Sequence, residues 1–399
     1  MIEFSHIHQL IKQKAEQYFD YAVKTRRHLH QHPELSFEEY KTAEFIQKEL
    51  DKINIPYKTM GKTGVVGILK GNKSSDKTVA LRADIDALPI QEIKGRSYGS
   101  QNPGVMHACG HDAHTAALLS VAHILSDLKD EFGGSIKLIF QPAEERAPGG
   151  AALLIKEGVL KNPEPESVTG QHVMPSLEAG QVGFRSGKYM ASADELYITI
   201  HGKGGHAAQP HQNIDPIAIS AQVIASLQQI VSRMADPRTP TVLSWGKISG
   251  KGASNVIPDK VEIAGTFRTF NEEWREEALS RIERIATSIT ESMHGHCNIA
   301  IKRGYPVLTN DEKLTQKNKK WAEEFLGKEQ VKDLDLWTAS EDFAYYSQVK
   351  PSCFYRLGTG NPSKNITSAV HTATFDIDEK SLLTGIGLMS YITLKQLGY

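Results

Sequence analysis

The segment 106–119, MHACGHDAHTAALL, concentrates side chains that bind transition metals. One cysteine and three histidines fall within nine positions, and an apolar, helix-forming stretch follows them. Thiolate and imidazole groups are common ligands of zinc and related ions, so Cys109 and His111 predict a metal site. Two other interpretations remain open on these residues alone: a thiol nucleophile activated by His111 or His114, and a polar loop that precedes a helix.

Further candidate ligands follow apolar, strand-like segments elsewhere in the chain. Asp84 and Asp86 end the segment KTVALRADID, Glu145 follows GSIKLIFQPA, and His172 lies in ESVTGQHVMP. His371 lies near the C-terminus. Ligands of open α/β sheets bind beyond the carboxyl ends of the strands. We therefore expect these residues to converge with Cys109 around a divalent cation.

The motif QPAEE places Glu144 and Glu145 side by side after an apolar strand. Two carboxylates that face one cavity repel each other unless one binds a cation and the other carries a proton. A carboxylate beside a metal-activated water can accept its proton and later deliver it to a leaving amine. The alternative is a solvated pair of glutamates that opens a loop.

Three polar residues between positions 200 and 270 are candidates for substrate binding. His206 follows glycines in GKGGHAAQPH, which permit close backbone approach to a ligand. Asn255 lies in SNVIPDK, and Arg268 lies in the strand-like segment GTFRTF, where its guanidinium can pair with a carboxylate. A structural role is the alternative for each of them.

The order of predicted elements indicates two domains. Amphipathic helices at 6–29 and 37–51, followed by alternating strands and helices, predict an α/β fold with a largely parallel sheet that helices cover on both faces. Residues 186–301 follow the order βαββαβ, which is typical of a ferredoxin-like unit. We interpret 186–301 as a domain inserted between 1–185 and 302–399, with one continuous domain as the alternative.

Composition excludes several classes of function. The 399 residues carry 46 Lys and Arg against 47 Asp and Glu, with no basic block, which argues against nucleic acid or an anionic membrane as a partner. No apolar run is long enough to span a bilayer, and the charged N-terminus is not a signal peptide. Three cysteines are too few for a disulfide framework, so we predict a cytoplasmic protein.

Nine motifs, in order and nearly from end to end, resemble one family. They are RRHLHQHPELSFEE, RADIDALP, MHACGHDAHTAALL, QPAEE, GQHVMP, GKGGHAAQPH, NVIPD, SEDFAYY and HTATFDID. They are similar to the amidohydrolase branch of the aminoacylase/carboxypeptidase metallopeptidases, which includes hippurate hydrolases, indole-acetyl-amino-acid hydrolases and N-acetyl-diaminopimelate deacetylases. Some general peptidases of the wider family carry His-x-Asp where this chain has RADID, which leaves the identity of the metal open.

The resemblance implies a zinc-peptidase-like domain, with a mostly parallel mixed sheet, that holds two divalent ions, and a ferredoxin-like domain that acts as a lid and forms a homodimer. Zinc or manganese is expected, with cobalt and nickel as further candidates. The resemblance implies that the metal ligands are Cys109, His111, Glu145, His172 and His371. It implies that Glu144 is the general base and that His206, from the neighbouring subunit of a dimer, stabilises the oxyanion. It further implies that Asn255 and Arg268 bind the substrate and that Asp84 orients a ligand.

The function that these assignments imply is metal-dependent hydrolysis of the amide bond in a small N-acyl amino acid. A dipeptidase or carboxypeptidase could use the same site. Two further hypotheses come from other classes: a hydrolase with Cys109 as its nucleophile, and a non-catalytic carrier that binds metal. The cysteine hypothesis leaves Glu144, Glu145 and His172 unexplained, and a closed structural metal site would need no neighbouring base.

Overall fold

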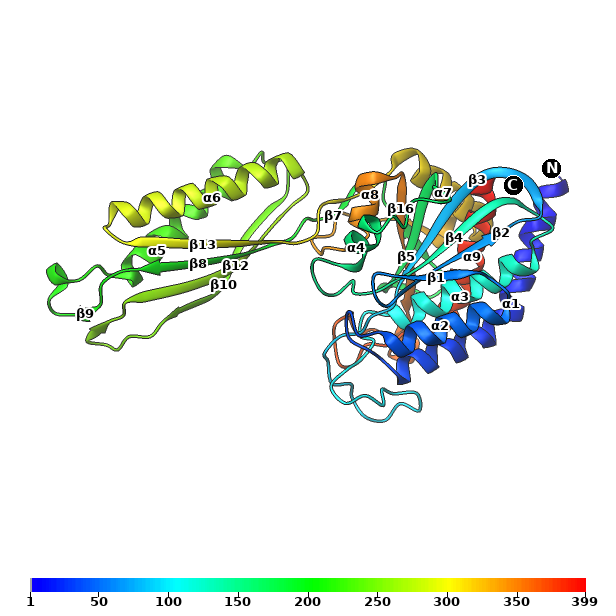
Figure 1. Ribbon diagram of the computed structural model, residues 1–399, viewed down its shortest axis with the longest axis horizontal. Coiled ribbons are helices and arrows are strands. Elements are labelled where there is room, and N and C mark those ends of the chain that lie inside the picture. The colour runs from blue at the N-terminus through cyan, green and yellow to red at the C-terminus, as the bar shows by residue number, and fades with distance from the viewer. Residues whose placement is uncertain (1) are drawn as a thin grey trace. The chain divides into compact units, whose positions relative to one another are not determined.

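In the computed structural model, the structure of residues 2–399 is described, with side chains from His6 onward, and the chain divides into two units (Figure 1). The larger unit extends to Gly187 and also includes Thr309–Asp335 and Asp342–Tyr399. The smaller unit comprises Lys188–Leu308 and Leu336–Glu341. The chain therefore leaves the larger unit and returns to it twice.

The larger unit is built on an eight-stranded mixed sheet, in the order β1-β2-β4-β3-β5-β16-β6-β15. Its strands are β1 (Tyr57–Met60), β2 (Gly64–Lys70), β3 (Lys73–Asp84), β4 (Gly133–Gln141), β5 (Ser167–Glu178), β6 (Val182–Phe184), β15 (Val331–Asp333) and β16 (Ser352–Gly360). The central strands β4, β3, β5 and β16 are parallel, whereas β2 is antiparallel to β4 and β6 to β16. The expected mostly parallel mixed sheet is confirmed.

Helices cover this sheet on both faces. The helices of the larger unit are α1 (Ile2–Gln31), α2 (Tyr40–Lys52), α3 (His111–Asp127), α4 (Gly150–Lys156), α7 (Glu312–Leu326), α8 (Ala344–Val349) and α9 (Lys380–Leu397), with the short η3 (Lys328–Gln330) and η4 (Pro362–Lys364). Helices α1, α3 and α9 pack against one another, and α4 contacts α8 across the sheet from them (Figure 1). Because both faces are covered, the second half of β3 is buried at every position.

The smaller unit contains a four-stranded antiparallel sheet in the order β10-β12-β8-β13. Its main elements follow the chain as β8 (Asp194–His201), α5 (Pro216–Leu227), β10 (Thr241–Gly250), β12 (Lys260–Thr269), α6 (Glu272–Ser292) and β13 (His296–Arg303). Helices α5 and α6 pack together against the apolar face of this sheet. This is the βαββαβ order of a ferredoxin-like unit.

Shorter elements complete the smaller unit and the connections to it. They are β9 (Gly205–His206), η1 (Pro210–Gln212), η2 (Ile230–Met234), β11 (Val256–Ile257), β7 (Gly187–Met190) and β14 (Leu308–Asn310). The unit includes residues beyond the expected 186–301, because the backbone of Ala191 bonds to the carbonyls of Trp337 and Ala339. Within residues 2–399, no helix is both long and apolar enough to cross a membrane.

The register of the parallel strands determines where the polar groups lie. Asp84 at the end of β3 pairs with Gln141 at the end of β4, and Arg82 pairs with Gly170 of β5. His172, two residues after Gly170, therefore lies level with Asp84 at the carboxyl ends of the strands. Ligand sites of open α/β sheets occupy this edge.

Candidate metal centre

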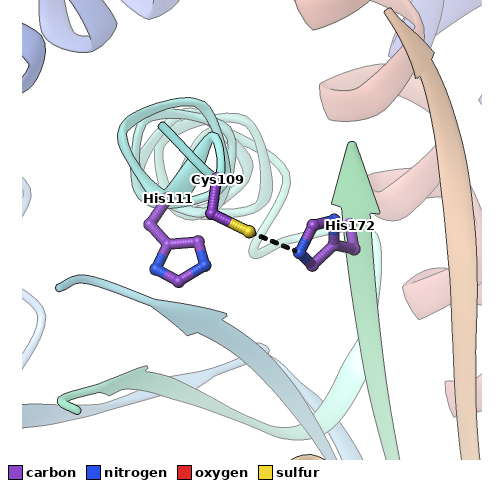
Figure 2. Close-up of side chains that lie close together, drawn as sticks. All are labelled: Cys109, His111 and His172. Carbon is purple, nitrogen blue, oxygen red and sulfur yellow. Dashed lines mark hydrogen bonds between the residues drawn. The ribbon is translucent and has the colours of Figure 1, made fainter. Parts of the chain in front are cut away.

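The five side chains expected to bind metal lie together in the larger unit. The Cys109 Sγ atom lies 3.4 Å from His172 Nε2 and 3.3 Å from His371 Nε2. Figure 2 shows the Cys109 side chain beside His111 and directed toward His172. The Glu145 Oε1 atom lies 3.2 Å from His371 Nε2 and 4.0 Å from His111 Nε2. Segments that are far apart in the sequence thus supply one compact group of ligand atoms.

These ligand atoms form two sets of three that share the Cys109 sulfur. One set is Cys109, His111 and His172, and the other is Cys109, Glu145 and His371. Within each set, all the ligand atoms lie within 4.8 Å of one another. A thiolate that belongs to both sets can bridge two cations, so the arrangement has the geometry of a dinuclear site.

The backbone around Cys109 makes a sharp turn into α3. Gly110 has a φ of +83°, and a Cβ atom at this position would lie 2.6 Å from Val173 Cγ2. A left-handed conformation and a close neighbour both favour glycine here. His371 also has a positive φ, 64°, and its N–H donates to the Ala108 carbonyl over 2.7 Å. This bond connects the C-terminal segment to the Cys109 turn.

Hydrogen bonds fix which nitrogen of two histidines faces the site. The Nδ1 atom of His111 donates to the backbone carbonyl of Asp86 over 2.9 Å, and Nδ1 of His172 donates to the Val173 carbonyl over 2.8 Å. Each Nε2 atom therefore faces the cluster. Metal-binding histidines are commonly oriented through their other ring nitrogen in this way.

Two buried atoms of the cluster make no hydrogen bond to the described residues. They are His111 Nε2 and Glu145 Oε1. Leaving a buried polar atom without a partner costs about 1–3 kcal/mol. One cation in each ligand set would coordinate these atoms and remove that cost, so the residues present fit divalent ions.

Charge around the cluster also favours a cation. Although burial opposes its protonation, the carboxylates of Asp84 and Asp86 raise the pKa of His111 to about 10. Burial, followed by the carboxylates of Glu145 and Glu144, raises the pKa of the Cys109 thiol well above its ordinary value. A nucleophilic thiolate is therefore disfavoured here without a neighbouring cation, which weighs against the cysteine hypothesis.

Asp86 organises the loop that carries the two glutamates. Its carboxylate accepts the backbone N–H of Glu144 over 3.1 Å, the backbone N–H of Glu145 over 3.0 Å and the Ser36 hydroxyl over 2.6 Å. The same carboxylate lies 3.2 Å from His111 Nδ1. The sequence indicated Asp86 as a strand-end carboxylate but assigned it no role; its contacts depend on the distant segments that the fold brings to it.

Glu144 is buried beside the candidate ligands. Its carboxylate shares a group of ligand atoms with His111 and Glu145 but belongs to neither set that contains Cys109. The backbone N–H of Asp342 lies 3.4 Å from Glu144 Oε1 and donates to it. The Asp342 carboxylate is itself paired with Arg82 over 2.7 Å. Glu144 thus lies close to the candidate metal ligands, but neither set that contains Cys109 needs it to complete three ligands.

Asp84 lies at the same edge and has two strong partners. Its carboxylate bonds to His114 Nδ1 over 2.5 Å and forms a fully buried ion pair with Arg82. Asp84 Oδ1 is 3.8 Å from His111 Nε2, so its closest histidine is His114. The side chains that Asp84 contacts directly are thus His114 and Arg82.

The three candidate substrate residues lie at two ends of the smaller unit. His206 pairs with Val256 between β9 and β11, and the Asn255 carbonyl accepts the N–H of Ala207 over 3.0 Å, so His206 and Asn255 are neighbours and exposed. Arg268 lies near the other end of β12, where it donates to the Thr338 carbonyl. The eight residue steps from Lys260 to Arg268 span about 26 Å. One copy of this unit does not gather the three residues at one point.

The fold and the cluster together define a hydrolase of the metallopeptidase type. The model of the peptidase family M20/M25/M40 matches residues 80–395 of this chain. The match covers most of the chain, which therefore belongs to this family. The expected relationship to amidohydrolases and peptidases is confirmed.

Individual relatives agree with this assignment. The chain is 46% identical over 304 residues to an N-acyl-L-amino acid amidohydrolase of Geobacillus stearothermophilus, covering 76% of this chain and 81% of the relative. It is 43% identical over 362 residues to the N-acetyl-L-cysteine deacetylase of Bacillus subtilis, covering 90% and 84%.

A solved structure shares the fold. It is that of a Bacillus subtilis protein described as a dinuclear metal binding peptidase from the M20 family. The two structures superpose with a TM-score of 0.80 at 33% identity, covering 96% of this chain and 99% of the other.

Proposed function

We propose that this protein hydrolyses the amide bond of N-acyl amino acids with the help of two divalent ions. The observation that carries the proposal is the pair of ligand sets that share the Cys109 sulfur beside the buried Glu144. Two relatives, each matched by this chain over most of its length, are named as an N-acyl-L-amino acid amidohydrolase and an N-acetyl-L-cysteine deacetylase. A third is described as binding two metals.

The ligand types favour zinc or manganese. One set offers a thiolate and two imidazoles, and the other offers a thiolate, a carboxylate and an imidazole. Sulfur and nitrogen ligands suit zinc, while the carboxylate also suits manganese; cobalt and nickel accept the same ligands.

When bound, such ions acidify a water molecule and polarise the carbonyl of the scissile amide. Glu144 would accept a proton of the water as its oxygen forms a bond to the carbonyl carbon. Glu144 would then deliver that proton to the amide nitrogen as the C–N bond breaks, which releases a carboxylic acid and a free amine. The Asp342 N–H that bonds to Glu144 Oε1 holds the carboxylate in place during both transfers. Asp86 keeps the Glu144 backbone fixed.

His206 is suited to stabilise the oxyanion. Its Nδ1 atom accepts the N–H of Ala208 over 3.1 Å, so in the neutral ring Nε2 carries the hydrogen and can donate it. Hydrogen-bond donors directed at the developing oxyanion are among the largest contributors to catalysis of acyl transfer. We assign Asn255, its exposed neighbour, to the substrate's acyl part and Arg268 to its carboxylate.

The separation of these residues supports a homodimer. His206 lies beside Val256, just before β12 begins, whereas Arg268 lies about 26 Å along β12 from Lys260. With this separation, we propose that two copies contribute to one substrate site. In this proposal Arg268 acts on the substrate bound by its own chain, and His206 acts on the substrate bound by the neighbouring subunit. The smaller unit serves as lid and dimerisation domain, and the domain limits follow the two compact units.

Short peptides are the second candidate substrates. The relative of known structure is described as a peptidase, and a dipeptide presents the same amide and carboxylate as an N-acyl amino acid. The three cysteines are all unpaired, and a thiol ligand has to stay reduced, which supports a cytoplasmic location.

Metal analysis and a substrate screen on the purified protein test the proposal together. We expect two ions per chain, loss of activity with a chelator, recovery on adding zinc or manganese, and release of free amine from acetyl or benzoyl amino acids. Dipeptides in the same screen separate the two substrate classes. Activity that survives complete removal of metal would contradict the proposal.

A further inference from the structure

His114 is the third histidine of the segment 106–119, and the proposed reaction gives it no task. It is buried on the first turn of α3, and its ring lies close to two candidate ligands: 5.4 Å from the His111 ring and 4.6 Å from the His172 ring, between centroids. Its nearest nitrogen also lies within 4.8 Å of ligand atoms of Asp84 and His111. Position alone would therefore make it a fourth metal-binding histidine, after His111, His172 and His371.

Hydrogen bonding excludes that role. The backbone N–H of Val173 donates to His114 Nε2 over 2.9 Å, so the lone pair of Nε2 is occupied. The other nitrogen, Nδ1, must then carry the hydrogen, which it donates to Asp84 Oδ1 over 2.5 Å. With both nitrogens occupied, the ring can neither coordinate a cation nor accept a proton from Cys109.

The bond to Val173 also connects His114 to the orientation of a neighbouring candidate ligand, His172. His114 holds the N–H of the peptide between His172 and Val173, here called the Val173 peptide. The carbonyl on the other side of Val173 accepts the Nδ1–H of His172 over 2.8 Å, so both ends of Val173 are connected to the His172 ring. The direction of that carbonyl sets the direction of the His172 ring. The ring in turn places its Nε2 atom 3.4 Å from the Cys109 sulfur.

Asp84 anchors His114 from the other side. The Asp84 carboxylate is held by the fully buried Arg82, which also pairs with Asp342. Asp342 donates its N–H to Glu144. A continuous series of buried polar contacts therefore extends from the proposed general base to the Val173 peptide.

We propose that His114 is a positioning residue, which aims His172 at its metal ion by holding the Val173 peptide between α3 and β5. The inference rests on the proposed two-metal function. It assigns His114 to only one ligand set, Cys109, His111 and His172, because His172, the ligand that His114 positions, belongs to that set and not to the set of Cys109, Glu145 and His371. Neighbours that orient a ligand typically change metal affinity about 10- to 100-fold when they are removed.

Metal titration of the full-length protein tests this assignment. The metal-free forms of the wild type and of His114→Leu are titrated with zinc against a chromophoric chelator, which yields two dissociation constants. We expect one constant to rise about 10- to 100-fold and the other to stay unchanged. His172→Gln and His371→Gln, which each remove one ligand from one set, identify the weakened site. Cobalt spectra, in which the thiolate band reports on Cys109, provide a second readout.

Two further variants separate positioning from a general structural role. His114→Gln can donate and accept through one terminal amide, so we expect it to recover part of the lost affinity. His123→Gln removes another histidine of α3, one that packs against Tyr18 and Tyr21, and should leave both constants unchanged. If His114→Leu does not fold, Asp84→Asn replaces it, with the same selective weakening expected.

The outcomes distinguish this inference from the proposed function. If the wild type does not bind two ions, the proposed function is wrong. Suppose instead that the wild type binds two ions, but His114→Leu retains both affinities, loses both equally, or behaves as His123→Gln does. In each of these cases the positioning role of His114 is wrong and the proposed function stands.

Discussion

The two units of this molecule hold their candidate functional groups in different ways. In the larger unit, most of the ligand atoms and Glu144 are buried, and each segment that carries them is tied by hydrogen bonds. In the smaller unit, His206 and Asn255 are exposed at one end and Arg268 is half-buried at the other. In the proposed homodimer, the reacting groups therefore lie within one unit, whereas His206 acts on the substrate bound by a second chain. Groups that are already held in the reactive geometry require little reorganisation free energy when the reaction begins.

The largest effect should come from the buried group that transfers the proton. Glu144→Gln should lower kcat by about 10²- to 10⁴-fold, because an amide cannot accept the proton of water. The metal content should stay unchanged, since neither set with Cys109 includes Glu144. Glu145→Gln should instead lose an ion together with activity, and exposed Glu166→Gln should change neither. Near-normal turnover by Glu144→Gln would refute the proposed mechanism.

The exposed end of the smaller unit should behave differently. His206→Ala should lower kcat by about 10²- to 10³-fold, as the loss of one oxyanion donor does. It should leave metal content and thermal stability intact, because the side chain is exposed. Mixing inactive Glu144→Gln subunits with His206→Ala subunits should restore activity, because some mixed dimers then contain one complete site. If mixing restores nothing, His206 does not act across subunits.

The rigidity of the buried site can be tested at the turn before α3. Gly110→Ala should lower the free energy of unfolding by about 2–5 kcal/mol, from the left-handed φ together with the close approach to Val173. Gly104→Ala is the matched control, because Gly104 has a similar φ, +80°, and no atom within 4 Å of the added Cβ. Urea unfolding measures both variants. Equal losses would show that the Val173 contact contributes nothing.

A smaller effect should appear as a pH dependence of stability. Burial raises the pKa of Glu39 to about 7, and this carboxyl accepts the N–H of Ala143 in the glutamate loop. Between the ordinary value of 4.5 and 7, the folded carboxyl keeps a proton that the unfolded chain releases. The free energy of unfolding should therefore fall as pH rises through this window, by roughly 1–3 kcal/mol from this group.

Glu39→Gln should remove this part of the pH dependence. Its stability relative to the wild type should rise from pH 4.5 to pH 7 and then level off, as measured by urea unfolding at several pH values. Glu166→Gln, at an exposed position, should leave the slope as it is. An unchanged slope in Glu39→Gln would place the titrating group elsewhere.

The sequence predicted the alternation of strands and helices well, because apolar periodicity depends on local spacing. The apolar, helix-forming stretch expected after the Cys and His residues of 106–119 belongs to a helix that already begins at His111, since the left-handed Gly110 starts the helix within the polar segment. The strands expected around β3, β4 and β5 lie close to their observed limits. Strand order and the antiparallel β2 and β6 depend on pairing between distant segments, which one sequence does not display.

The candidate site was predictable as a list of residue types but not as a network. Cys109 and His111 stand out because a thiol and imidazoles crowd together before a helix, and His172 because it lies in an apolar strand. The roles of Asp86 and His114 follow from the register of neighbouring strands, so nothing in the local sequence separates them from other polar residues. The distance between His206 and Arg268 likewise depends on the length and direction of β12.

The interrupted course of the larger unit has a consequence for how the protein is made. On the ribosome, β5 is complete before the smaller unit is synthesised, but its neighbour β16 emerges only afterwards. During that interval one edge of β5 lacks its partner, and such open edges are prone to aggregate. His371 emerges later still, so the nascent chain cannot complete its ligand cluster until the segment that follows β16 has been synthesised.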